Sequence, residues 1–121
     1  MMLQEEKDSS VIGSDRVDGT TVYGADKEKI GKVDKLLIDK LGGNVTDVII
    51  SAGGFLGIGD EKHSIPWEKL EYDTERGGYC IDVTKEQLMD APRFDSADAD
   101  RPYDRDYQRS VYEYWTVTPY W

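Results

Sequence analysis

Short strand-forming segments separated by glycine-containing turns fill the chain from residue 23 to residue 94. The two longest, residues 30–39 and 45–52, flank Gly42-Gly43-Asn44, which predicts a β-hairpin. Many short strands followed by one helix favour a small, mainly all-β barrel of antiparallel strands over alternating strand–helix units. A closed barrel would suit a chain of 121 residues because it leaves no unpaired edge strand.

The hydrophobic pattern of the two long segments predicts how their faces are buried. In residues 30–39 the apolar positions change parity, which indicates either a β-bulge near Asp34-Lys35 or burial of both faces at the end of the strand. In residues 45–52 the apolar positions mostly keep one parity, so we expect a mostly one-sided strand. The residues expected on its buried face are Val48, Ile50 and Ala52.

Shorter strands and one helix are predicted around this hairpin. Strand-forming residues recur at 20–23, 63–65, 70–72 and 79–83, and Pro66 ends the second of these segments. Thr84 and Gln87 have the spacing of a capping box, which predicts the start of a short helix that Pro92 ends. We therefore divide the chain into a flexible lead over residues 1–10, a barrel over 11–94 and an acidic, aromatic-rich tail over 95–121.

The tail contains more than half of the aromatic side chains of the protein. Tyr103, Tyr107, Val111 and Trp115 are spaced four apart, which predicts a short helix beginning near Pro102. The alternative is an extended chain from Val111 onward. Because disordered tails rarely carry so many aromatic residues, we expect this tail to dock, either on its own barrel or on another chain.

Composition restricts the partners and the location of the protein. The net charge of -10 disfavours direct nucleic-acid binding, which depends on Lys and Arg neutralising phosphates, and it suits a partner with a basic face. A single cysteine excludes an intrachain disulfide. The chain shows no apolar leader and no apolar run of the roughly 20 residues that span a bilayer. We expect a cytoplasmic protein without membrane insertion.

A glycine-rich loop over residues 53–59 superficially resembles loops that bind phosphate. A Walker loop ends in Lys-Ser/Thr, whereas Asp60-Glu61 follows here, and the segment that comes next is strand-like rather than helical. We therefore interpret the loop as a tight connection whose apolar side chains cover a hydrophobic surface. Those side chains are Phe55, Leu56 and Ile58.

No group of residues in the sequence has the pattern of a catalytic or metal site. His63 is the only histidine and Cys80 the only thiol, which argues against a zinc site. Ser64 adjoins His63, but neighbours in a strand point to opposite faces, so we expect no catalytic pair and a half-exposed histidine. The acidic stretch over residues 95–106 lacks the EF-hand pattern. We expect no enzymatic activity, cofactor or metal.

Four segments, residues 29–39, 44–59, 62–70 and 79–94, resemble successive signatures of the PRC-barrel domain family. The resemblance implies a compact all-β barrel. The family includes the cytoplasmic domain of the photosynthetic reaction-centre H subunit and the C-terminal domain of a ribosome-maturation factor, and it implies an assembly and protein-contact role. The ending Pro119-Tyr120-Trp121 resembles that of bacterial members with one such domain and an aromatic tail. Within these segments, the combination that makes the resemblance specific is Ile30-Gly31, residues 36–39, 54–59, Ile65-Pro66-Trp67 and residues 83–88.

These observations predict a non-catalytic protein-interaction module that self-associates, with itself as the expected partner in a homodimer. One alternative is a ribosome-, RNA-processing- or photosynthetic-complex-linked accessory module. Another is a small-ligand binder. For the ribosome-linked and ligand-binding alternatives, a basic patch of Lys27, Lys29, Lys32 and Lys35 would form part of the surface. The expected partner-binding residues are Phe55, Leu56, Ile58, Trp115, Tyr120 and Trp121.

Overall fold

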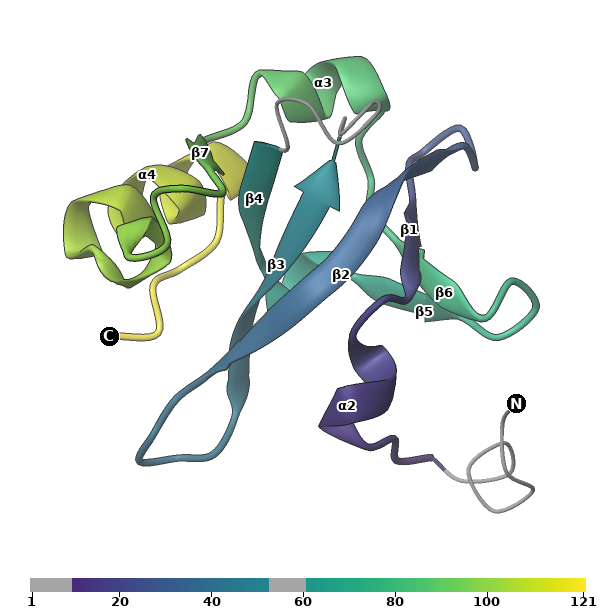
Figure 1. Cartoon of the computed structure of the whole chain (residues 1–121), viewed down its shortest axis with the longest axis horizontal. Coiled ribbons are helices and arrows are strands. Elements are labelled where there is room, and N and C mark those ends of the chain that lie inside the picture. The colour runs from purple at the N-terminus through teal and green to yellow at the C-terminus, as the bar shows by residue number, and fades with distance from the viewer. Residues whose placement is uncertain (1–9, 53–60) are drawn as a thin grey trace.

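The computed structural model describes residues 10–52 and 61–121, which form one seven-stranded sheet and three α-helices (Figure 1). The strands are β1 (Thr21–Tyr23), β2 (Lys29–Ile38), β3 (Val45–Ala52), β4 (Glu61–Pro66), β5 (Glu71–Asp73), β6 (Gly78–Cys80) and β7 (Arg93–Asp95). The α-helices are α2 (Ser14–Val17), α3 (Lys85–Met89) and α4 (Arg105–Trp115). Two 3₁₀ turns, η2 (Trp67–Lys69) and η3 (Arg101–Tyr103), complete the described elements.

The strands are ordered β5-β6-β1-β2-β3-β4-β7, which confirms a mainly β fold. All neighbouring pairs are antiparallel except β1 and β6, which pair in parallel. The prediction of closure is wrong for the described strands, because the three-residue strands β5 and β7 remain as edges. The sheet is therefore only approximately a barrel. Short edge strands offer little backbone for further pairing.

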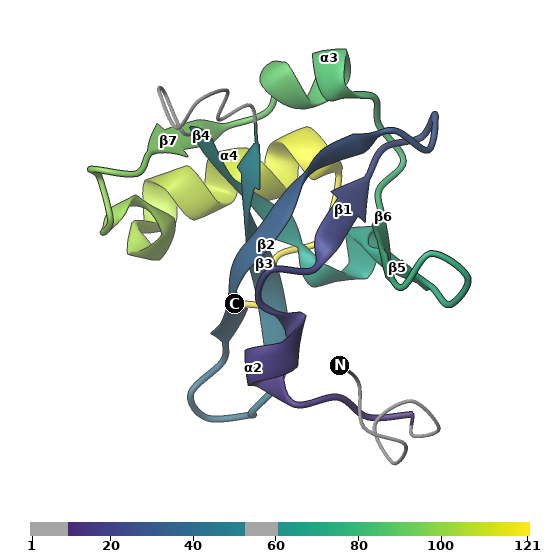
Figure 2. The same cartoon turned by 45° about the vertical axis from the view of Figure 1, so that its right-hand side comes forward.

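The predicted β2–β3 hairpin is present and projects from the body of the protein (Figures 1 and 2). The pairing register shifts between Val33 and Lys35, which confirms the β-bulge expected near Asp34. The Asp34 carboxylate lies 3.5 Å from the Lys62 ammonium of β4. The extra residue in β2 accounts for the change of parity seen in the sequence.

The prediction that β3 is buried mostly on one face is wrong. Four consecutive residues, from Asp47 to Ile50, are buried, so both faces of the strand are covered. One face belongs to the hydrophobic core with Val48 and Ile50. The other face carries Asp47, which contacts Tyr112 of α4. The C-terminal helix thus covers the face that the sequence pattern assigns to solvent.

His63 of β4 is also buried, with 1 % of its surface exposed, which corrects the expectation of a half-exposed side chain. It pairs across the ladder with the fully buried Ile50, and its flank is covered by β7, where it pairs with Arg93. Burial lowers the pKa of the imidazole because the charged form loses hydration. His63 is therefore a neutral core residue near pH 7.

Both predicted helices form, and each has a side-chain cap. The capping box of α3 is confirmed, because Thr84 Oγ1 accepts from the Gln87 backbone and Gln87 Oε1 accepts from the Thr84 backbone. Helix α4 begins after Asp104, whose carboxylate accepts from the Tyr107 backbone at 3.1 Å. It ends before Thr116, which has a left-handed backbone conformation with φ of 56°.

Helix α4 packs against β4, so the tail docks on its own chain (Figure 1). Its buried residues lie at helical spacing and join the same core as the sheet. The alternative of an extended chain is wrong between Val111 and Trp115. The buried residues of this helix are Tyr107, Val111, Tyr112 and Trp115.

We expect Trp115→Ala to lower the free energy of unfolding by about 3–5 kcal/mol, because it leaves a cavity in the core. Glu113→Ala is the control, since Glu113 is exposed on the same helix and should change stability by no more than about 0.5 kcal/mol. Urea unfolding followed by circular dichroism measures both. Equal stability of the two variants would show that α4 is not part of the cooperative core.

Candidate partner-binding site

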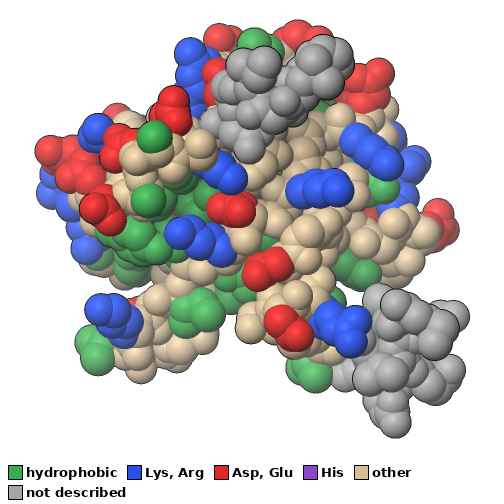
Figure 3. Space-filling view, in the orientation of Figure 1, with side chains coloured by type: hydrophobic (Ala, Val, Ile, Leu, Met, Phe, Trp, Pro, Cys, Tyr) green, Lys and Arg blue, Asp and Glu red, His purple; other side chains and the backbone are tan. Residues whose placement is uncertain are grey.

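Exposed apolar side chains lie at the tip of the β2–β3 hairpin and at the C-terminus. Leu41 at the hairpin tip is 99 % exposed, and Tyr120 and Trp121 are 50 % and 41 % exposed. The space-filling view shows hydrophobic side chains on the projecting hairpin and on the helical side of the molecule, bordered by charged ones (Figure 3). Both cartoon views place the C-terminus on the hairpin side of the sheet (Figures 1 and 2). These segments form the candidate partner-binding face.

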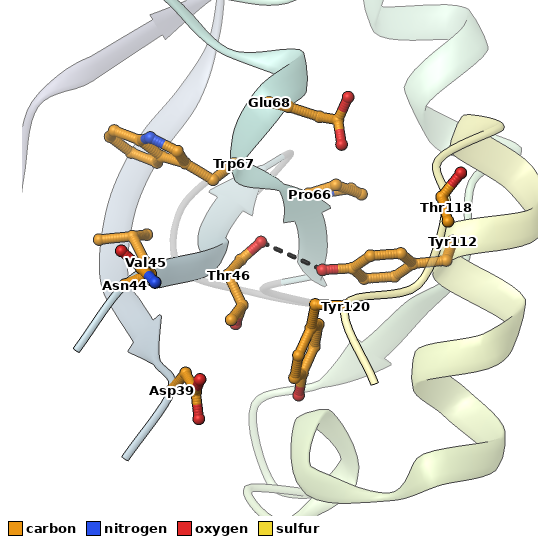
Figure 4. Close-up of a pocket in the computed structure, with 10 residues that line it drawn as sticks. All are labelled: Asp39, Asn44, Val45, Thr46, Pro66, Trp67, Glu68, Tyr112, Thr118 and Tyr120. Atoms are coloured by element: carbon orange, nitrogen blue, oxygen red, sulfur yellow. Dashed lines mark hydrogen bonds between the residues drawn. The ribbon is translucent and has the colours of Figure 1, made fainter. Parts of the chain in front are cut away.

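A pocket of about 320 Å³ lies between the hairpin and the C-terminal tail (Figure 4). It unites the end of β2 and the start of β3, the turn after β4, and helix α4 with the residues after it. The hydroxyl of Tyr112 points into the centre of the group in Figure 4, where it meets the backbone of Thr46. The lining residues are Asp39, Asn44, Val45, Thr46, Pro66, Trp67, Glu68, Tyr112, Thr118 and Tyr120.

A buried hydrogen-bonded network begins at Thr46 and Tyr112 of the pocket lining and extends inward to Asp47 and Ser64. The Tyr112 hydroxyl lies 3.2 Å from both the backbone oxygen of Thr46 and Asp47 Oδ1, and these two acceptors share its single proton. The Ser64 hydroxyl donates to the other carboxylate oxygen of Asp47 at 3.5 Å. Because burying a carboxylate without hydrogen-bond partners is energetically costly, these hydrogen bonds offset the cost of burying Asp47.

Burial raises the pKa of both Asp47 and Tyr112. Loss of hydration raises the pKa of the Asp47 carboxyl, and hydrogen bonds from Thr46, Tyr112 and Ser64 oppose that change. Burial, followed by the negative charge of Asp47, raises the pKa of the Tyr112 hydroxyl. Tyr112 therefore stays protonated and acts as a hydrogen-bond donor rather than as a base.

The two C-terminal aromatic residues are held by contacts with their own chain. The ring of Trp121 lies 5.1 Å from that of Tyr112 and 5.0 Å from that of Tyr120, both edge to face. The guanidinium of Arg105 lies 4.2 Å from the centre of the Trp121 ring and 5.9 Å from that of Tyr120. We call Tyr120 and Trp121 the C-terminal aromatic pair. It is ordered yet half-exposed.

The structure separates the predicted contact residues into three groups. Tyr120 and Trp121 are exposed beside the pocket. Trp115 is only 6 % exposed, and it packs in the core from the far end of α4. Phe55, Leu56 and Ile58, which were also predicted to contact a partner, lie outside the described residues.

Two residues of this face were not singled out by the sequence. Tyr112 belongs to the aromatic tail, but nothing local distinguishes it from Tyr114, which is partly exposed and donates to the backbone of Gln87. Asp47 interrupts an apolar strand, and that interruption is the signal that could have indicated a buried polar contact. The residue that Asp47 contacts is 65 positions away.

The side chains around the pocket are mainly polar, aromatic and acidic. Among residues 10–52 and 61–121, no three His, Cys, Asp or Glu side chains come together as metal ligands. His63 and Ser64 are buried on opposite faces of β4, as expected for neighbours in a strand. In the same part of the chain, no helix is long and apolar enough to cross a membrane.

Comparison with protein-family models gives a match to the PRC-barrel domain over residues 10–88. Comparison with curated proteins gives no match. The matched region contains the hairpin and the Pro66–Glu68 side of the pocket. It ends before α4, so Tyr112, Thr118 and Tyr120 add the remaining wall from outside the matched region.

We expect the wild type to lose stability relative to Asp47→Asn as pH rises from 3.8 through the raised pKa of Asp47. In that interval the folded protein binds more protons than the unfolded chain, so the free energy of unfolding decreases with pH. Asparagine keeps an acceptor for Tyr112 and cannot ionise. Urea unfolding over a pH series gives the difference between the two proteins.

Asp90→Asn is the matched control, because Asp90 is exposed at the end of α3. Its difference from wild type should change little over the same pH interval. The assignment of Asp47 as a buried carboxyl with a raised pKa would be contradicted by either of two results. The difference in free energy of unfolding between wild type and Asp47→Asn could stay constant with pH, or it could change in favour of the wild type as pH rises.

Proposed function

This chain belongs to the PRC-barrel domain family, and from that premise we propose that it is a non-catalytic protein-interaction module that associates with a second copy of itself. PRC-barrel domains are generally non-catalytic and serve in protein interaction. The match extends over more than half of the chain. The cytoplasmic location expected from the sequence is part of the same proposal, and cell fractionation tests it.

The observation that carries self-association is the C-terminal aromatic pair. Tyr and Trp are enriched in protein interfaces because their rings bury a large area, and Tyr120 and Trp121 leave about half of theirs available. Their contacts with Tyr112 and Arg105 hold them in place before association. Such preorganisation reduces the entropy lost on binding.

A symmetric dimer would use the same surface on both copies. We assign its contacts to Tyr120 and Trp121 at the C-terminus and to the exposed Leu41 at the tip of the hairpin. Trp115 supports this face from the core, through its packing in α4. Phe55, Leu56 and Ile58 stay in the proposal on the evidence of the sequence alone.

The net charge of the protein determines how this association should depend on salt. Each copy carries a net charge of -10, so two copies repel one another at long range. Salt screens that repulsion, with a Debye length of roughly 8 Å at physiological ionic strength. Self-association through aromatic rings should therefore strengthen as salt is added, whereas an interface of opposite charges would weaken.

We expect the double variant Tyr120→Ser/Trp121→Ser to weaken dimerisation by at least about tenfold, the effect of losing one interface residue worth roughly 1.4 kcal/mol. Analytical ultracentrifugation over a concentration series, at low and high salt, measures the dissociation constant. Both residues lie beyond the core-forming part of the tail, so the variant keeps α4 intact.

Met89→Ser is the control, because Met89 is an equally exposed apolar residue on α3, away from the C-terminus. It should leave the dissociation constant unchanged. A wild-type protein that sediments as a monomer at every concentration and salt level would overturn the self-association proposal. So would a dimer that the double variant and the control retain equally.

A further inference from the structure

We propose that the pocket between the β2–β3 hairpin and the C-terminal tail binds an arginine side chain presented by a partner protein. This inference names the chemistry of a partner for the proposed interaction module, so it rests on that interaction role. It does not rest on self-association. Its evidence is the size, the charge and the aromatic lining of the pocket.

The size of the pocket suits one side chain. Its volume of about 320 Å³ is at the lower limit of the roughly 300–1,000 Å³ typical of pockets for small molecules and cofactors. The pocket is also bounded by exposed residues at its outer edge, including Thr118 and Tyr120. A side chain could enter from a partner surface while its own backbone stays outside.

The charge of the lining selects a cation. Asp39 and Glu68 line the pocket, and its lining contains no lysine or arginine. Figure 4 shows Glu68 and Asp39 on different sides of the labelled group, with Tyr120 and the Tyr112 hydroxyl between them. Within the described part of the chain, neither carboxylate forms an ion pair. A guanidinium would supply the missing positive charge.

The Asp39 carboxylate is also held in position, by backbone N–H groups and without an ion pair among the described residues. The oxygens of Asp39 accept from the backbone N–H groups of Leu41 and Gly42, each at 3.3 Å, in the turn of the hairpin. Glu68 lies in η2, directly after Pro66 and Trp67 at the end of β4. An anionic ligand would face both of these negative charges and no basic side chain in the lining.

The aromatic lining favours arginine over lysine. A planar guanidinium stacks on aromatic rings and can bind carboxylates through several N–H groups at once. Tyr120 and Tyr112 supply rings in the lining, whereas the indole of Trp67 lies edge to face with Tyr79, 5.6 Å away, and Figure 4 shows it pointing away from Tyr112. The Arg105 contact shows that this aromatic pair already accommodates one guanidinium in the same chain.

The test is a titration followed in amide NMR spectra, which suit a chain of 13.7 kDa. The probe is a short neutral peptide with one central arginine, and the matched probe has citrulline, the uncharged isostere, at the same position. We expect the arginine peptide to shift the amide signals of Thr46, Glu68 and Tyr120. The citrulline peptide should leave them in place, because it lacks the charge.

Three variants test the lining. Glu68→Gln and Asp39→Asn each remove one charge, and each should weaken arginine-peptide binding by about fivefold. Asparagine keeps one of the two acceptor oxygens that the hairpin turn uses at position 39. Tyr120→Leu removes the ring and should weaken binding by a similar factor of about five. Glu71→Gln, an equal loss of charge at an exposed position of β5, should leave binding unchanged.

Three results would overturn the inference. The first is equal affinity for the arginine and citrulline peptides, and the second is a set of amide shifts confined to other parts of the chain. The third is an affinity for the arginine peptide that neither Glu68→Gln nor Asp39→Asn changes. Sedimentation of the same variants separates this failure from that of self-association. If the protein dimerises but does not bind the arginine peptide, only the proposal of an arginine-binding pocket is wrong. If the protein is a monomer and binds the peptide through Glu68 and Asp39, only the self-association proposal is wrong.

Discussion

The hydrogen bond from the Tyr112 hydroxyl to the Asp47 carboxylate connects helix α4 to the interior strand β3, across 65 positions of the chain. Apolar packing of Val111 and Trp115 supplies area, but hydrophobic contact alone has little directional preference. The hydrogen bond to the buried carboxylate provides that preference, because another register of the helix would remove Tyr112 from the donors that Asp47 accepts from. The position of every residue after α4 follows from this register.

This anchoring also explains how a sheet with open edges encloses a core. The described strands do not close, and an exposed face of β3 would leave Ile49 in water. Helix α4 covers that face, and the rings of Tyr107 and Phe94 pack edge to face between the helix and the last strand, 5.7 Å apart. A chain of this length has a modest core, so one eleven-residue helix is a substantial part of it.

Local features of the sequence predicted local structure well. The Gly42-Gly43 hairpin, the bulge at Asp34 and the Thr84 capping box each depend on residues within a few positions of one another. The burial of both faces of β3 and of His63 could not be predicted in this way, because both depend on elements that are distant in sequence. The pocket was missed for the same reason. It unites the hairpin, the turn after β4 and the tail, and none of these segments is unusual alone.

The matched family region and the tail make different contributions to the candidate face. The region over residues 10–88 builds the sheet, the hairpin and the two carboxylates of the pocket. The tail adds Tyr112, Tyr120 and Trp121, and with them the aromatic character that both proposals require. A PRC-barrel protein with a different tail would keep the acidic side of this pocket but lose the rings of Tyr112 and Tyr120. Partner choice would then vary with the tail, because the aromatic wall and the acidic wall come from separate segments, which the packing of α4 and the contacts of Tyr112 with Thr46 and Asp47 bring together.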